Sequence, residues 1–219
     1  MPEMLTALID ALNAPAFVLG ALTASRAELA GALLGVWMVW CNLRVDPLAW
    51  RRYGGAARFA LDTDVLEITA QGLIDMGADG FVHRFYTDDD LMFQVVSRDR
   101  EGQKDEDHTL FMPWVSAWPP NPAARRIWLD RLKARTFTAE GLPDYTRLWF
   151  GPEDETQDPV QFWENVYDDR AATEARRIYQ TCMLFARELP AEGRELLLAI
   201  EQEPQGGDLT HEVMLGIPL

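Results

Sequence analysis

The sequence predicts an α+β domain, a mainly antiparallel β-sheet with one or two helices, preceded by an apolar helical segment at the N-terminus. Two observations lead to this class. After Gly54 and Gly55, short runs of alternating apolar and polar residues recur between turn signals, which is typical of half-buried strands. Before them, residues 29–43 form an uncharged apolar run of helical character. We therefore expect two parts, residues 1–52 and residues 55–219.

The N-terminal part predicts either a single membrane helix over residues 27–50 or a buried amphipathic helix. The uncharged run is shorter than the ~20 residues that cross a bilayer, but Arg44 can extend toward the interface. Glu3 and Asp10 without early basic residues disfavour a signal peptide. If the segment spans a membrane, Arg51 and Arg52 after it place residues 55–219 in the cytoplasm.

The later part predicts short strands and one helix. Asn121 and Pro122 are a helix start, with apolar residues following at helical spacing, so a helix is expected at Pro122–Ala134. Residues 98–107 contain no apolar residue and predict an exposed loop. Strands are expected at Arg58–Leu61, Val65–Ala70, Phe81–Tyr86, Leu91–Ser97, Thr109–Trp114, Tyr145–Phe150, Val160–Tyr167, Ile178–Arg187, Glu195–Glu201 and Glu212–Ile217.

Composition excludes some classes of function. The formal net charge is −15, and nearly all of it lies after residue 50, so the main domain repels phosphate backbones and nucleic-acid binding is not expected. Cys41 and Cys182 lie in segments of different character and predict neither a disulfide framework nor a zinc site. No nucleotide-binding or hydrolase motif is present in a usable context, and no cofactor is expected.

One cluster of residues has chemical potential. Three adjacent carboxylates in a turn can attract Mg²⁺ or Ca²⁺, and a nearby histidine can act as a base. The alternative is a hairpin turn with aspartates bonded to local amides, beside a histidine that packs with Phe81 and Phe85. The candidate residues are His83, Arg84, Tyr86, Asp88, Asp89 and Asp90, with the last three as candidate metal ligands.

Three runs of sequence resemble a known family. They are GLIDMGADGFVHRFYTDDDLMFQVV at Gly72–Val96, PVQFWENVYDD at Pro159–Asp169 and CMLFARELPAEGRELLLAIEQE at Cys182–Glu203. Together they resemble the YjfK-like family of uncharacterised bacterial proteins (domain of unknown function 2491) over about residues 55–219. The resemblance carries no catalytic residues. It implies an accessory role at the inner face of the bacterial envelope, near envelope-stress proteins.

The N-terminal part has a separate resemblance. The run AELAGALLGVWMVWCNLRVDPLAW at residues 27–50 resembles the first membrane helix and following turn of PnuC-type nicotinamide riboside transporters. Those transporters continue into further membrane helices, whereas this chain turns at once to a soluble pattern. No substrate-binding residue is carried across.

Three hypotheses of function follow. The first is a non-enzymatic accessory or interaction protein at the inner face of the membrane, with protein partners there and membrane contact through residues 27–50. The second is a metal-assisted hydrolase using the Asp88–Asp90 turn. The third is a part in nicotinamide riboside transport through the N-terminal segment. A cytoplasmic location is the alternative to the inner membrane.

Overall fold

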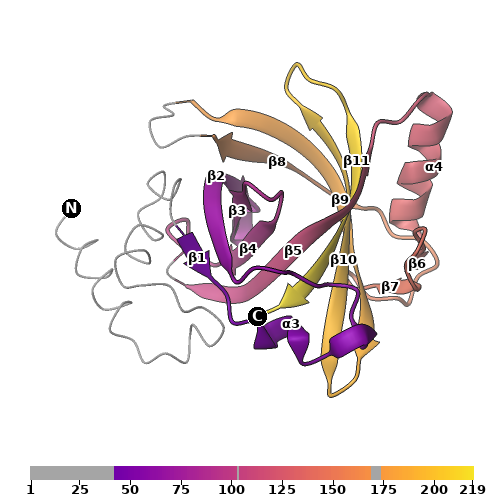
Figure 1. Ribbon diagram of the computed structural model, residues 1–219. Helices are drawn as coiled ribbons and strands as arrows, with labels where there is room; N and C mark the ends of the chain where they lie inside the picture. The colour runs from indigo at the N-terminus through magenta and orange to yellow at the C-terminus, as the bar shows by residue number, and fades with distance from the viewer. Residues whose placement is uncertain (1–41, 103, 169–173) are drawn as a thin grey trace.

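The structure is a computed structural model that describes residues 42–102, 104–168 and 174–219. These residues form eleven strands in one sheet (Figure 1). The strands are β1 (Asn42–Arg44), β2 (Val65–Asp75), β3 (Phe81–Thr87), β4 (Met92–Ser97), β5 (Asp105–Ala117), β6 (Thr136–Phe137), β7 (Tyr145–Arg147), β8 (Val160–Tyr167), β9 (Arg176–Leu189), β10 (Gly193–Pro204) and β11 (Thr210–Pro218). The helices are α3 (Leu48–Arg51) and α4 (Pro122–Lys133), with 3₁₀ turns η2 (Gly54–Ala56) and η3 (Gly77–Asp79).

Eight of the strands close into an antiparallel barrel in the order β2-β3-β4-β5-β11-β10-β9-β8. The barrel closes because β8 also pairs with β2, with Gln71 opposite Tyr167 and Ile74 opposite Glu164. The predicted α+β class is therefore wrong: the described residues form a closed barrel with two short helices. The alternation of apolar and polar residues along a strand predicts which residues face which side of the sheet. It does not predict that β2 and β8, the first and last strands in this order, pair with each other.

The barrel wall is apolar on both faces over much of its length. Side chains that point into the lumen form the inner core: Met92, Phe111, Cys182, Leu184, Ala186, Leu196, Leu198, Ile200 and Met214. Alternate residues of the same strands, such as Met183, Phe185 and Leu197, face outward into a larger outer core. At one end of the lumen, Gly216 leaves room for Phe111, because an added Cβ would lie 2.5 Å from the phenyl ring. This end is filled by apolar side chains.

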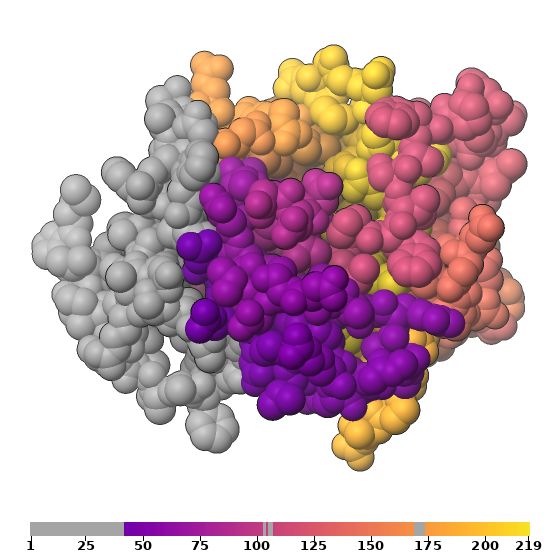
Figure 2. Space-filling view, in the orientation of Figure 1, coloured from indigo at the N-terminus to yellow at the C-terminus, as the bar shows by residue number. Residues whose placement is uncertain are grey.

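The segment after residue 41 covers part of the outer wall instead of continuing a helix. Asn42–Arg44 pairs with Val65–Glu67 as strand β1, and only the four residues of α3 are helical. Leu43, Val45 and Trp50 are buried in the outer core. The predicted apolar helix is thus wrong over residues 42–50, while residues 27–41 lie outside the described part. Figure 2 shows the indigo residues of this segment packed against the body of the barrel.

The strand predicted at Arg58–Leu61 is absent. These residues are extended coil, and the amides of Arg58 and Phe59 donate to the buried Glu195 carboxylate at 2.5 and 2.6 Å instead of to a neighbouring strand. Residues 42–61 therefore form a strap along the barrel, held by the β1–β2 pairing at its start and by Glu195 of β10 at its end. Neither helix in the described ranges has the length and apolarity required to cross a membrane.

Helix α4 lies against the outside of the barrel, in contact with β6 and β9 (Figure 1). It begins as the sequence predicts: the Asn121 side chain accepts a hydrogen bond from the Ala124 amide, and Pro122 occupies the first turn. Its buried residues are Trp128 and Leu132, and Trp128 stacks on His211 of β11.

Candidate functional site

A pocket of about 450 Å³ occupies the end of the lumen opposite Phe111. Buried side chains form its floor: Arg84, Met92, Gln180, Ile200 and Met214. Exposed residues at its rim are Asp90, Pro113, Val115, Ser116 and Arg176. The interior of an eight-stranded barrel is just wide enough to be filled by side chains or to hold one small ligand. Here side chains fill the end at Phe111, and the other end contains the pocket.

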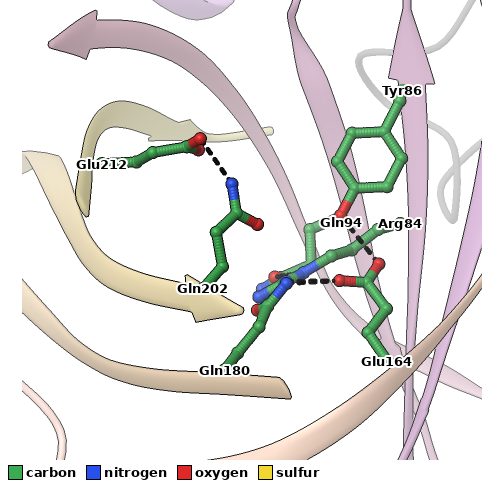
Figure 3. Close-up of polar contacts among 7 residues, drawn as sticks. All are labelled: Arg84, Tyr86, Gln94, Glu164, Gln180, Gln202 and Glu212. Carbon is green, nitrogen blue, oxygen red and sulfur yellow. Dashed lines mark hydrogen bonds and ion pairs between the residues drawn. The ribbon is translucent and has the colours of Figure 1, made fainter. Parts of the chain in front are cut away.

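The floor of the pocket is a hydrogen-bond network around a buried ion pair (Figure 3). Arg84 Nη1 on β3 donates to Glu164 Oε2 on β8 at 3.1 Å and to Gln180 Oε1 on β9 at 2.6 Å, and its Nε donates to Gln94 Oε1 at 3.1 Å. Gln180 Nε2 and the Tyr86 hydroxyl donate to the two Glu164 oxygens at 2.6 and 2.7 Å. Four strands are thereby joined across the lumen.

Gly72 makes space for this network. It lies opposite Val166 on the β2–β8 pairing, next to Glu164, and a Cβ there would overlap the Glu164 carboxylate. A side chain at residue 72 would therefore displace the carboxylate from Arg84. The glycine at this strand position is explained by close approach rather than by backbone conformation.

Burial governs the protonation of the network. Burial lowers the pKa of Arg84, but Glu164, Tyr86 and Cys182 together raise it more, so the net shift is upward and the guanidinium stays charged. Burial, and then Glu164, raises the pKa of Tyr86 well above its ordinary value. Burial also raises the pKa of the Cys182 thiol to about 12, so the thiol is protonated at neutral pH. These three groups hold fixed protons and offer neither a base nor a thiolate nucleophile near pH 7.

A second polar pair lies nearer the mouth of the pocket. The Gln202 amide on β10 donates to the Glu212 carboxylate on β11 (Figure 3). Burial raises the pKa of Glu212 and the charge of Asp90 adds to this, while the Gln202 hydrogen bond and the charge of Arg84 oppose it, and the net shift is upward. Glu212 is thus a carboxylate at the edge of an apolar wall, with a neutral amide as its partner.

The structure divides the predicted cluster among three places. Arg84, Tyr86 and Asp90 all line the pocket. His83 points the opposite way, because neighbours on a strand alternate, and it packs on the outer side near Gly102. Asp88 and Asp89 are exposed in the β3–β4 turn.

Hydrogen bonds within residues 87–91 account for the conformation of the β3–β4 turn. The Leu91 amide donates to the Thr87 hydroxyl oxygen at 3.1 Å, the Thr87 amide donates to the Leu91 carbonyl, and Asp90 has a left-handed φ of 58°. Aspartate tolerates this conformation better than most residues. Within the described ranges, no three His, Cys, Asp or Glu side chains converge in a way that would hold a metal ion. The metal site at Asp88–Asp90 stays a prediction.

Sequence reasoning missed most of the residues that form the pocket and the hydrogen-bond network at its floor. The sequence did contain a signal for two of them. Glu164 and Gln180 lie on the face of their strands that is otherwise apolar, as in Phe162-x-Glu164-x-Val166 and Ile178-x-Gln180-x-Cys182. A polar residue on a buried apolar face indicates a hydrogen-bond partner in the interior. Here that partner, Arg84, comes from a strand distant in the sequence. The missed residues are Gln94, Glu164, Arg176, Gln180, Gln202 and Glu212.

Comparison with known proteins places the chain in a family. A family model described as "Protein of unknown function (DUF2491)" matches residues 18–219. The chain belongs to this family. The DUF2491 match includes residues 42–54, which pack on the barrel. No curated protein and no solved structure matches the chain.

The finer resemblances have a different outcome. The YjfK-like name and the PnuC-like resemblance of residues 27–50 are not confirmed by the comparisons. Residues 42–50 of that segment form strand β1, a connection and helix α3 on the barrel. The DUF2491 family description supplies no activity, so the function is argued from the pocket.

Proposed function

We propose that this protein is a non-enzymatic accessory protein whose barrel binds a small ligand in the open end of its lumen. The observation that carries the proposal is the fully buried Arg84–Glu164 pair at the floor of a pocket of about 450 Å³. Taking both charges out of water costs several kcal/mol per ion, and apolar side chains of similar size fill such a space with no such cost. A costly polar floor under an open cavity is typical of a site that orients a ligand.

The chemistry of the lining favours binding over catalysis. Arg84, Tyr86 and Cys182 keep their protons near neutral pH, because burial raises the pKa of Tyr86 and of Cys182, and neighbouring groups outweigh burial at Arg84. Both described histidines with lowered pKa, His83 and His211, lie on the outer side of the barrel, away from the pocket lining. A hydrolytic mechanism needs a nucleophile and a base within hydrogen-bond reach of each other in the site.

The accessory role at the inner face of the membrane, with protein partners there, remains part of the proposal through the family resemblance. The exposed Trp118 and Ile127 side chains beside α4 offer apolar surface for such a partner. Ligand binding in the lumen and partner contact outside it are separable, because they use opposite faces of the wall.

The test is native mass spectrometry of the full chain purified without denaturation. We expect a small molecule to remain bound to the wild type and to be lost from Ala70→Phe, since Ala70 lines the pocket and a phenyl group fills it. The matched control is Ala78→Phe, the same change at an exposed turn residue, which is expected to retain the molecule. An equal mass on wild type and Ala70→Phe would refute the site.

A further inference from the structure

The geometry points to a small organic cation, an amine with an apolar body, as the ligand of the barrel pocket, with Glu212 as its charge partner. The inference rests on the ligand-binding function proposed above and adds the chemical class of the ligand.

Both arginines that line the pocket already have partners. Arg84 is bonded to the oxygens of Glu164, Gln180 and Gln94. Arg176 at the rim makes two hydrogen bonds to Asp168, at 3.1 and 3.0 Å. An anionic ligand would compete with Glu164 or Asp168 for a guanidinium whose charge is already balanced, and separating Glu164 from Arg84 would leave a buried carboxylate without its counterion. The pocket therefore offers little to an anion.

The two carboxylates that line the pocket are in a different situation. Glu212 is bonded by the neutral Gln202 amide and the Ser116 hydroxyl, and it lies within range of the charges of Asp90 and Arg84. Among the residues that the structure describes, neither carboxylate belongs to an ion pair. With Arg84 balanced by Glu164 and Arg176 by Asp168, the acidic charge of Glu212 and Asp90 is left over. A low-dielectric wall strengthens its attraction for a cation.

Much of the remaining lining is apolar, beside the neutral polar side chains of Thr69, Thr87 and Ser116. Val115 and Pro113 lie near the rim, and Met92, Ile200 and Met214 lie deeper. A purely hydrophilic cation such as a metal ion leaves these surfaces without contact, whereas an alkyl or aromatic body covers them. The combination of an unbalanced carboxylate at the mouth and apolar walls below it matches an amphipathic amine.

Three probes with one ring system test this: tryptamine as the cation, tryptophol as the neutral analogue and indole-3-propionate as the anion. Binding is measured by isothermal titration calorimetry on the full chain at pH 7.5. We expect tryptamine to bind at least about tenfold tighter than either analogue. Glu212→Gln is expected to weaken tryptamine about tenfold and to leave tryptophol unchanged. Asp88→Asn, an exposed change in the adjacent turn outside the lining, is expected to leave both unchanged.

Other outcomes separate the two proposals. If tryptophol or indole-3-propionate binds as tightly as tryptamine and Ala70→Phe abolishes that binding, the pocket is a ligand site but the cation inference is wrong. If Glu212→Gln leaves the affinity for tryptamine unchanged, Glu212 is not the charge partner of the bound cation. If no probe binds and native mass spectrometry also finds no ligand sensitive to Ala70→Phe, both proposals fail.

Discussion

Two buried arginine–glutamate pairs in this barrel have the same chemistry and different surroundings. Arg84 and Glu164 face the lumen, and their hydrogen bonds go to the side chains of Gln94, Gln180 and Tyr86. Arg187 and Glu195 face outward, where Glu195 accepts from two backbone amides and Arg187 donates to the Ala56 carbonyl. Both carboxylates are completely buried.

This difference indicates that the Arg187–Glu195 pair has a structural role and that the Arg84–Glu164 pair belongs to a binding site. The backbone groups that meet Arg187 and Glu195 cannot be removed by mutation, so this pair fixes the strap of residues 42–61 to the barrel. The partners of Arg84 and Glu164 are side chains next to an open pocket, where water can replace lost bonds. We therefore expect the outer pair to be required for stability and the lumen pair to be replaceable.

The largest effect that persists when both partners are replaced is expected at the Arg187–Glu195 pair. Glu195→Ala leaves Arg187, the Tyr145 hydroxyl and the amides of Arg58 and Phe59 without their acceptor. Breaking a buried pair on one side costs about 3–5 kcal/mol of unfolding free energy. Urea denaturation of the full chain measures it.

A double variant and a milder one control this result. Arg187→Met with Glu195→Met should stay destabilised by at least about 2 kcal/mol, because the two amides remain buried and unpaired. Tyr145→Phe, which removes one hydrogen bond of 2.7 Å, should cost about 1 kcal/mol. A double variant as stable as the wild type would contradict the structural role of the Arg187–Glu195 pair.

The lumen pair is expected to behave in the opposite way. Glu164→Met alone leaves Arg84 charged and unpaired in the lumen and should cost about 3–5 kcal/mol. Arg84→Met combined with Glu164→Met should return the unfolding free energy to within about 1 kcal/mol of wild type, since apolar replacement of a whole buried pair is often neutral. If the double variant is as unstable as the single one, the two pairs do not differ.

A smaller effect is expected at Gly72. Gly72→Ala places a methyl group against the Glu164 carboxylate and should cost about 1–3 kcal/mol, as overpacking of a core does. The matched control is Gly55→Ala, where an added Cβ meets no atom within 4 Å, and its stability should change by less than about 0.5 kcal/mol. Thermal unfolding followed by circular dichroism distinguishes the two. Equal effects would show that Glu164 moves freely in the lumen.

The smallest effect depends on pH. Because burial raises the pKa of Glu212, the folded protein holds that proton more tightly than the unfolded chain. Stability is therefore lost as pH rises from the ordinary glutamate value through the raised one. Glu212→Gln cannot ionise, so it should melt about 2 °C above wild type at pH 8 and together with it at pH 4. If Glu212→Gln raises the melting temperature equally at pH 8 and pH 4, the ionisation of Glu212 is not the cause of the increase.

Some elements were within reach of the sequence. The turn chemistry at Asn121 and Pro122 fixes the start of α4, and alternation fixes β8 at Val160–Tyr167 as predicted. Arg58–Leu61 was predicted wrongly because the local pattern fits a strand, while the amides find a carboxylate on β10. Residues 42–50 were predicted wrongly because apolar character alone does not distinguish a membrane helix from a segment buried on a barrel.

The candidate site was predictable only in part. Arg84, Tyr86 and Asp90 are close in sequence, and alternation together with a turn brings them to one end of the lumen. Glu164 and Gln180 lie 80 and 96 residues from Arg84, so no local pattern joins them. His83, the residue with the most familiar chemistry, lies on the other side of the wall.

The sequence by itself determined the approximate positions of the barrel strands β2–β5 and β8–β11, the capped helix and the excess of negative charge, because each depends on neighbours along the chain. Only the tertiary structure decided that the sheet closes, that Arg84 meets Glu164, and that one end of the lumen stays open. Barrel closure depends on the pairing of β2 with β8, strands about 90 residues apart, and that contact is set by the packing of the whole chain rather than by any segment of it.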